Sequence, residues 1–184
     1  MISRDESLDL LKSKLSNENL FKHCLAVEAI MKGLANHLGE DEEAWSICGL
    51  LHDIDYEQTK DDHKNHGLIA EEILKDKVSD EVMHAIKSHN FENTGVDPES
   101  NMDFALIAAD AISGLIIASA LIRPDKKLEE VELKSIKKKF KQKDFARNCN
   151  RENMMLCEKF GVDKDKFFEL ALDSMKTISE DLGL

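Results

Sequence analysis

Three features of the sequence predict an all-α fold. Its 184 residues include only 2 Pro and 8 Gly, so few positions interrupt a helix. Apolar residues recur at alternating steps of three and four along much of the chain, which is the period of a helix with one buried face. The chain is 42% hydrophobic and 34% charged, as is typical of a globular domain. We expect one domain over residues 1–184, because no repeat, low-complexity tract or linker divides the chain.

Three helices are predicted before the His52-Asp53 pair. Ser3 and Glu6 form the pattern of a capping box at the start of the first helix. The second helix covers about residues 19–36 and carries one apolar stripe, made of Leu20, Cys24, Val27, Met31 and Leu34. The third begins near Asp41, where acidic neighbours favour a helix N-terminus, and carries its apolar side up to His52-Asp53. A polar run over residues 55–65 follows.

Two shorter helices come next. One covers residues 66–74, and Ser79 begins another whose inner face contains Val82, Ile86 and His89. Residues 93–98, with Gly95 and Pro98, form the clearest loop of the sequence.

The most apolar stretch, residues 104–122, contains one charge, Asp110. An Asp near the centre of a bilayer costs about 2.5 to 3.5 kcal/mol, so we interpret this stretch as a central buried helix and not as a membrane span. Residues 128–184 predict three more helices. The last of them is expected to bury Phe167, Leu170, Ala171, Ser174, Met175, Ile178 and Leu182.

Charge, cysteines and missing motifs limit the function. The net charge is −12, and because an acidic surface repels phosphodiester backbones, we expect nucleic acid to be an unlikely partner. Residues 1–6 lack the apolar region of a signal peptide and the 4 Cys form no C-x-x-C pair, so we expect a cytoplasmic protein with reduced thiols and no membrane association. The motifs of serine-elbow hydrolases, Rossmann domains, P-loops and zincins are absent.

Six His and Asp residues lie at or beside the apolar faces of predicted helices, in the order His23, His52-Asp53, His66, His89 and Asp110. An unpaired buried carboxylate is too costly to keep ionised, so Asp110 needs a partner. A metal cation would pair with this carboxylate and would also be bound by the histidines. Imidazole and carboxylate ligands suit divalent iron, manganese, nickel, cobalt or zinc, and a site with two ions would need a bridging carboxylate such as Asp53.

This ordered set, with the pair in Gly-Leu-Leu-His-Asp-Ile-Asp at residues 49–55, resembles the HD-domain superfamily of metal-dependent phosphohydrolases, and more narrowly its small stand-alone predicted hydrolases. The resemblance implies an all-helical HD bundle with a motif core over 19–122 and additional C-terminal helices over 123–184. It also implies one or two divalent ions. His23, His52, Asp53 and Asp110 would bind the first, and His66 and His89 would bind a second one bridged by Asp53.

Two positions bear on how far the resemblance extends. Many members of the superfamily read His-Asp-Ile-Gly, whereas Asp55 replaces the Gly here. This departure leaves metal binding intact and weakens any transfer of substrate specificity. His63 competes with His66 for one ligand position, and His66 is preferred because Gly67 and the apolar helix follow it directly.

The activity implied by the resemblance is hydrolysis of a phosphate ester, either a phosphomonoester or a nucleotide-like substrate, by a metal-bound hydroxide. Asp53 and His52 would be the catalytic residues, and the substrate would be a small phosphorylated molecule. One alternative is an HD-fold oxygenase with binuclear iron, which the same ligands permit. The other is a non-enzymatic regulatory HD module, which predicts gaps in the ligand set, and none of the six residues is missing.

The basic residues are concentrated in one segment. Residues 124–151 contain ten Lys and Arg against five Asp and Glu. Lys137, Lys138 and the preceding Arg123 are therefore candidates for binding a substrate phosphate. The alternatives are a solvated basic face or a contact with the acidic surface of a second subunit, which would make the protein a homo-oligomer.

Overall fold

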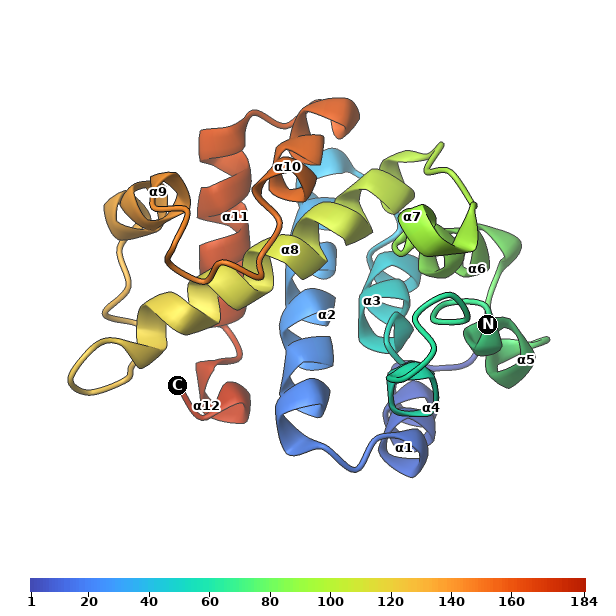
Figure 1. Cartoon of the computed structure of the whole chain (residues 1–184). Coiled ribbons are helices and arrows are strands. Elements are labelled where there is room, and N and C mark those ends of the chain that lie inside the picture. The colour runs from blue at the N-terminus through green and yellow to red at the C-terminus, as the bar shows by residue number, and fades with distance from the viewer.

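The computed structural model describes residues 1–184 and contains helices but no strand (Figure 1), which confirms the predicted all-α class. The first half of the chain contains α1 (Arg4–Lys14), α2 (Glu18–Leu38), α3 (Glu42–Leu51), α4 (Tyr56–Thr59), α5 (Ile69–Leu74), α6 (Asp80–Ser88) and α7 (Phe91–Thr94). The second half contains α8 (Asn101–Leu121), α9 (Leu133–Lys141), α10 (Arg151–Met154), the 3-10 helix η1 (Met155–Phe160), α11 (Lys164–Lys176) and α12 (Ser179–Leu182).

Helix starts follow local sequence signals. Ser3 and Glu6 form the predicted capping box of α1, and the side chain of Asp41 accepts hydrogen bonds from the first turn of α3. Asn17 and Ser79 cap α2 and α6 in the same way. Each cap satisfies backbone N–H groups that have no partner within the helix, which fixes where these helices begin.

Helix α8 crosses the middle of the molecule, from α6 and α7 to α9 (Figure 1), and packs on α2, α6, α10 and η1. It is the one helix long and apolar enough to cross a membrane by length and composition, and 67% of its most apolar window is buried inside the protein. This burial agrees with the central helix predicted over residues 104–122. The helix begins earlier than predicted because Ser100 and Asp103 form a second capping box.

The core is continuous: 45 buried residues form a single hydrophobic cluster, and α2 packs on α3, α8 and α11. Helices α2 and α3 approach closely at Gly49. A Cβ atom at this position would lie 2.9 Å from the Glu28 Cα atom and the Val27 carbonyl oxygen, so only glycine permits the observed distance. This contact brings the His23 side of α2 against the C-terminal end of α3.

Three local differences from the sequence predictions are evident. The polar run 55–65 contains the short helix α4, and α7 extends through Thr94 into the predicted loop. The last predicted helix is two helices, because Ile178, at φ −122° and ψ 21°, leaves helical geometry and α12 then packs on α2. Periodicity alone does not report such a break, since the residues on both sides of it still face the core.

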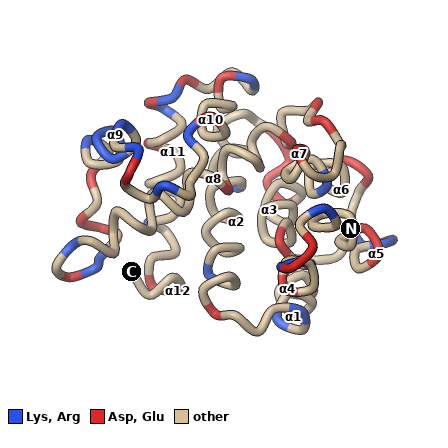
Figure 2. Tube along the Cα trace, in the orientation of Figure 1, with Lys and Arg blue, Asp and Glu red and all other residues tan.

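Charge is distributed unevenly along the molecule (Figure 2). Lys and Arg gather on α9, and Asp and Glu are frequent around α4, α5 and α7, at the other end of the view. The basic segment predicted from the sequence is therefore an edge of the structure formed by α9 and its flanking loops.

Candidate metal centre

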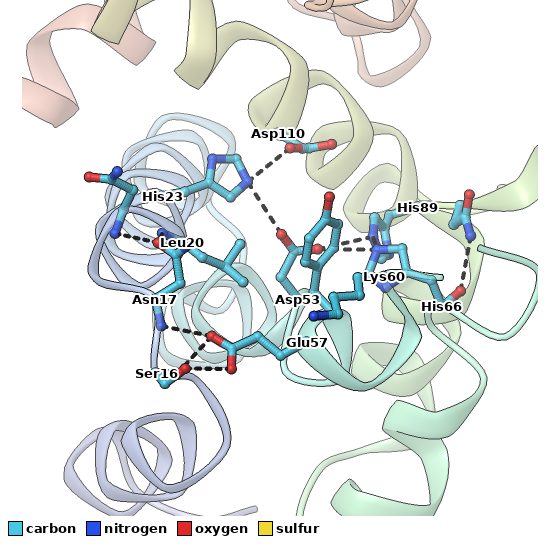
Figure 3. A pocket seen from close by; sticks show the side chains of 13 residues that line it. Ser16, Asn17, Leu20, His23, Asp53, Glu57, Lys60, His66, His89 and Asp110 are labelled. Carbon is cyan, nitrogen blue, oxygen red and sulfur yellow. Dashed lines mark hydrogen bonds and ion pairs between the residues drawn. The ribbon is translucent and has the colours of Figure 1, made fainter. Parts of the chain in front are cut away.

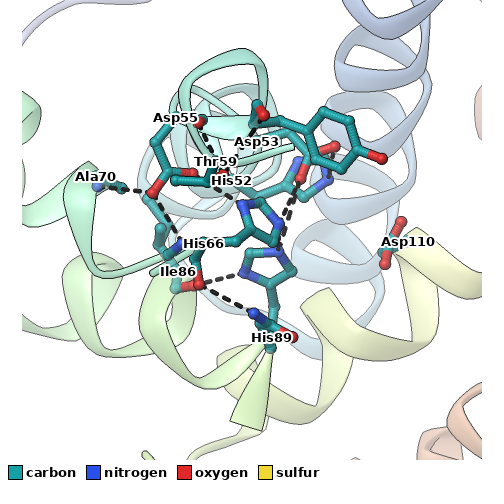
Figure 4. A network of polar contacts seen from close by, with 12 residues as sticks. His52, Asp53, Asp55, Thr59, His66, Ala70, Ile86, His89 and Asp110 are labelled. Carbon is teal, nitrogen blue, oxygen red and sulfur yellow. Dashed lines mark hydrogen bonds and ion pairs between the residues drawn. The ribbon is translucent and has the colours of Figure 1, made fainter. Parts of the chain in front are cut away.

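Asp53 lies at the centre of the predicted ligand set and divides its two carboxylate oxygens between two groups of imidazoles (Figures 3 and 4). Its Oδ2 atom is 3.7 Å from His23 Nε2 and 3.5 Å from His52 Nε2. Its Oδ1 atom is 3.2 Å from His66 Nε2 and 3.6 Å from His89 Nε2. A carboxylate placed in this way can bridge two cations.

The imidazoles within each group also meet through their Nε2 atoms. The His23 and His52 Nε2 atoms are 3.2 Å apart, and those of His66 and His89 are 3.0 Å apart. Asp110 extends from α8 to the first group, with its Oδ1 atom 3.1 Å from His23 Nε2. The structure thus brings all six predicted residues together from five separate parts of the chain.

Hydrogen bonds at the opposite ring nitrogen fix the orientation of these imidazoles. His52 Nδ1 donates to the Gly49 carbonyl, and His89 Nδ1 donates to the Ile86 carbonyl. Burial lowers the pKa of His52 to about 4, so the ring is neutral at physiological pH and its Nε2 atom carries a lone pair. Neutral imidazoles held by a second hydrogen bond are the usual form of histidine ligands to metals.

His23 is likewise oriented by a hydrogen bond at Nδ1, which comes from the central helix α8. The Ser113 hydroxyl donates to the Asp110 carbonyl, so its oxygen accepts from His23 Nδ1 at 3.2 Å. This contact again leaves Nε2 directed at the carboxylates. Because Ser113 is one turn along α8 from Asp110, the same helix supplies a ligand and orients another one.

Asp55 holds His66, and sequence reasoning did not identify this role. Its fully buried carboxylate accepts from His66 Nδ1 at 2.9 Å and from the backbone N–H groups of Gly67 and Ala70 (Figure 4). Gly67 has φ +90°, and a Cβ there would lie 3.0 Å from the Ile86 carbonyl oxygen. The residue that departs from the His-Asp-Ile-Gly pattern therefore positions a ligand. The signal available in the sequence was an acidic residue, Asp55, only two positions after Asp53.

The pKa values of the centre show that its carboxylates favour positive charge beside them. Burial alone would raise the pKa of Asp53, but the neighbouring His52 and the hydrogen bonds from His66 and His89 hold it well below its usual value. Burial would lower the pKa of His66, but its hydrogen bonds to Asp53 and Asp55 outweigh burial and raise it to about 10. The donor set consists of imidazole nitrogens and carboxylate oxygens only, and it fits divalent transition metals.

These ligands form the floor of a pocket of about 780 Å³. Asn17, Asn19, Tyr56 and Lys60 stand exposed at its rim. The other lining residues are Ser16, Leu20, His23, Asp53, Glu57, His66, His89, Asn90 and Asp110. The centre is therefore accessible to a substrate from one side.

The remaining predicted residues lie elsewhere. His63 is exposed outside the cluster, and only its backbone carbonyl takes part, accepting from Asn90. Lys137 pairs with Asp165 at 2.8 Å and Arg123 pairs with Glu130 at 3.5 Å. Neither these two residues nor Lys138 lines the pocket, so the structure does not bring the basic candidates together with the metal ligands.

Comparison with known proteins gives named relatives. The chain is 29% identical over 180 residues to Ribonuclease Y of Oleidesulfovibrio alaskensis, which covers 95% of this chain and 34% of the relative. It is 30% identical over 187 residues to Ribonuclease Y of Thermoanaerobacter pseudethanolicus, covering 95% of this chain and 35% of the relative. The chain thus spans about a third of the length of these relatives. No solved structure gave a significant match.

These names correct one prediction. We expected a small phosphorylated substrate and considered nucleic acid unlikely, whereas the relatives are named as ribonucleases. The error came from the use of net charge, because −12 is a sum over the whole chain, while a partner responds to the charge at the site it contacts.

The family itself is shown by a domain model. The model described as "HD domain" matches residues 20–115, which contain all six residues of the metal cluster. Proteins with this domain bind divalent metals, and the family suggests a hydrolase. The chain belongs to the HD domain family.

Proposed function

We propose that this protein is a metal-dependent hydrolase that cleaves phosphodiester bonds in RNA. The observation that carries the proposal is the placement of Asp53, whose two oxygens each face a pair of imidazoles on the floor of an open pocket. In this arrangement His23, His52 and Asp110 would hold one divalent cation, His66 and His89 a second, and Asp53 both.

Two bound cations would supply Lewis acidity, lowering the pKa of water and neutralising negative charge on phosphate oxygens. The residues of the chain would hold and orient this pair. Asp53, His23, His66 and His89 form the floor, the fully buried His52 lies against Asp53, and Asp110, with 38% of its side chain exposed, faces the pocket from α8.

The nucleophile is proposed to be water, because the serine and cysteine side chains nearest the ligands are unsuitable. The hydroxyls among the lining residues belong to Ser16 and Tyr56, and Ser16 Oγ is occupied as a donor to Glu57. Cys24, the thiol nearest in sequence to His23, is buried, and burial raises its pKa well above the usual value. A protonated buried thiol is a poor nucleophile.

RNA is proposed as the substrate because the relatives over 95% of this chain are named Ribonuclease Y. The rim of the pocket agrees with such a substrate. Its exposed residues are amides, a hydroxyl, an aromatic ring and one lysine, the kinds of groups that contact bases, riboses and phosphates of single-stranded RNA. We expect the cleavage to be hydrolytic and to need no side-chain intermediate.

The test is cleavage of a labelled single-stranded RNA by protein loaded with Mn²⁺. We expect cleavage by the wild-type protein and loss of at least a hundredfold in rate for Asp53→Asn. Asp103→Asn is the matched control, because Asp103 is also a buried carboxylate that accepts from a histidine, His84, but it lies outside the pocket. RNA that stays intact, while p-nitrophenyl phosphate is hydrolysed, would show that the substrate class is wrong.

A further inference from the structure

One part of the pocket takes no part in metal binding and lies where a substrate must enter. Helix α4 contributes Tyr56 and Glu57 to the pocket lining, and the residue that caps its C-terminus, Lys60, also lines the pocket. Tyr56 and Lys60 are four residues apart, so their side chains lie on the same side of one helical turn. In Figure 3 the Lys60 side chain extends toward the space between Asp53 and Glu57.

Lys60 is the only lysine or arginine that lines the pocket. It forms no ion pair, whereas Lys137 and Arg123 on the basic edge are already paired with carboxylates. The carboxylates of the metal ligands would be neutralised by bound cations, which leaves Lys60 as the free positive charge beside the centre. An unpaired ammonium group in this position is suited to a phosphate oxygen of the substrate.

Tyr56 is the only tyrosine of the chain and one of its few large hydrophobic side chains that are exposed, with 39% exposure. Its ring stands perpendicular to the His66 ring, with centroids 5.3 Å apart. This contact with a proposed metal ligand fixes the ring at the mouth of the pocket. Aromatic rings held in this way are common stacking partners of nucleic acid bases.

The segment that carries both residues is anchored at two points. Glu57 accepts hydrogen bonds from the Ser16 hydroxyl and from the backbone N–H groups of Ser16 and Asn17, at 2.7 to 2.9 Å. On the inner side, Asp55 directly precedes the helix, and its buried carboxylate accepts from His66 Nδ1 and from the backbone N–H groups of Gly67 and Ala70. Tyr56 and Lys60 therefore project from a short helix that is held between the start of α2 and the metal centre.

We propose that Tyr56 and Lys60 form a subsite for one nucleotide of a single-stranded RNA, with its base stacked on Tyr56 and its phosphate bound by Lys60. This inference rests on the proposed RNA substrate and adds the side chains that hold the strand beside the metal centre. A single strand is specified because stacking requires an unpaired base.

The experiment measures binding separately from cleavage. The Mn²⁺-loaded protein is titrated into fluorescein-labelled hexa-adenylate with phosphorothioate linkages, and into a matched abasic ribose-phosphate hexamer, with anisotropy as the readout. We expect Tyr56→Ala to weaken binding of hexa-adenylate by about tenfold and leave the abasic probe unaffected, because only the base is lost as a partner. Tyr56→Phe keeps the ring and should bind like wild type.

Lys60→Ala should weaken binding of both probes and lower the slope of log K against log salt concentration by about 0.7, the value for one phosphate contact on a single strand. Lys64→Ala is the matched control, because Lys64 is exposed four residues further along the chain and does not line the pocket. Equal binding of hexa-adenylate by wild type, Tyr56→Ala and Lys60→Ala would overturn the subsite. Weaker binding of both probes to the same extent by Tyr56→Ala would also overturn it, because the loss would not depend on the base. Failure of the proposed function would instead appear as absence of RNA cleavage by the wild-type protein.

Discussion

Asp55 Oδ1 accepts a hydrogen bond from His66 Nδ1 at 2.9 Å, so a carboxylate outside the ligand set directs a histidine at Asp53. A partner of this kind fixes the tautomer and the ring orientation, and its loss typically lowers metal affinity by about 10- to 100-fold. We therefore predict that Asp55→Asn lowers the affinity for the metal held by His66 and His89 by this factor and leaves the affinity for the other metal unchanged. Calorimetric titration of the metal-free protein with Mn²⁺ measures both affinities.

The control for this variant is Asp103→Asn. Asp103 is fully buried and accepts from His84 Nδ1 and two backbone N–H groups, as Asp55 does from His66 and its neighbours. Both substitutions disturb a buried carboxylate, so a loss of metal affinity common to the two variants would assign Asp55 a merely structural role.

The two groups of imidazoles predict separable metal sites. His89→Ala should reduce the bound Mn²⁺ from two ions to one, and His23→Ala should do the same through the other group, because each removes a ligand from only one side of Asp53. Asp53→Ala should reduce both. Elemental analysis after dialysis gives the stoichiometry, with His37→Ala, an exposed residue of α2, as control. Retention of two ions by His89→Ala would contradict the bridged arrangement.

Metal binding should strengthen as the pH rises. The contacts of His66 with Asp53 and Asp55 outweigh its burial and raise its pKa to about 10, so the metal-free ring is protonated throughout the neutral range, and this proton must leave when a cation takes Nε2. Affinity should therefore rise about tenfold per pH unit for each proton released between pH 6 and 9. Calorimetry in buffers of different ionisation enthalpy counts the released protons, and a pH-independent affinity would exclude this account.

The same raised pKa should make the metal-free protein less stable toward unfolding as the pH rises, which is opposite to the effect of pH on metal affinity. The interaction of protonated His66 with the two carboxylates is fully present below its unfolded value near 6.5 and is lost as the pH rises toward about 10. Metal-loaded protein lacks this dependence at His66, because the cation replaces the proton.

The close approach of α2 and α3 predicts a stability effect at Gly49. Gly49→Ala would place a Cβ 2.9 Å from backbone atoms of α2, which cannot move alone, so we expect a loss of about 1 to 3 kcal/mol in the free energy of unfolding. Gly33→Ala is the comparison, because its nearest neighbour is the Ser174 side chain, which can rotate away. Urea denaturation measures both, and a smaller loss for Gly49→Ala than for Gly33→Ala would contradict the argument.

Local signals accounted for much of the fold. The capping box at Ser3 and the cap at Asp41 are visible in the sequence because the partners lie within one helical turn. The order of His and Asp residues predicted which side chains meet, and His66 rather than His63 lies in the cluster. Residues 1–184 as a single domain and the cytoplasmic location stay predictions.

What the sequence did not predict depends on contacts between distant residues. The role of Asp55 requires a partner 11 positions away, and the anchor between Glu57 and Ser16 spans 41 positions. No periodicity reports contacts of this kind. The basic cluster was assigned by its composition, whereas Lys137 pairs with Asp165 on another helix, which only the folded chain reveals.

The six proposed ligands extend from residue 23 to residue 110 and come from both ends of the motif core, so a bound cation would act as a cross-link between segments that are independent in the unfolded chain. Occupancy and folding are then linked by mass action. At a free metal concentration one hundred times the dissociation constant, the folded state gains about 2.7 kcal/mol for each such site. The persistence of the native chain in a cell would thus follow the supply of the metal that the reaction needs.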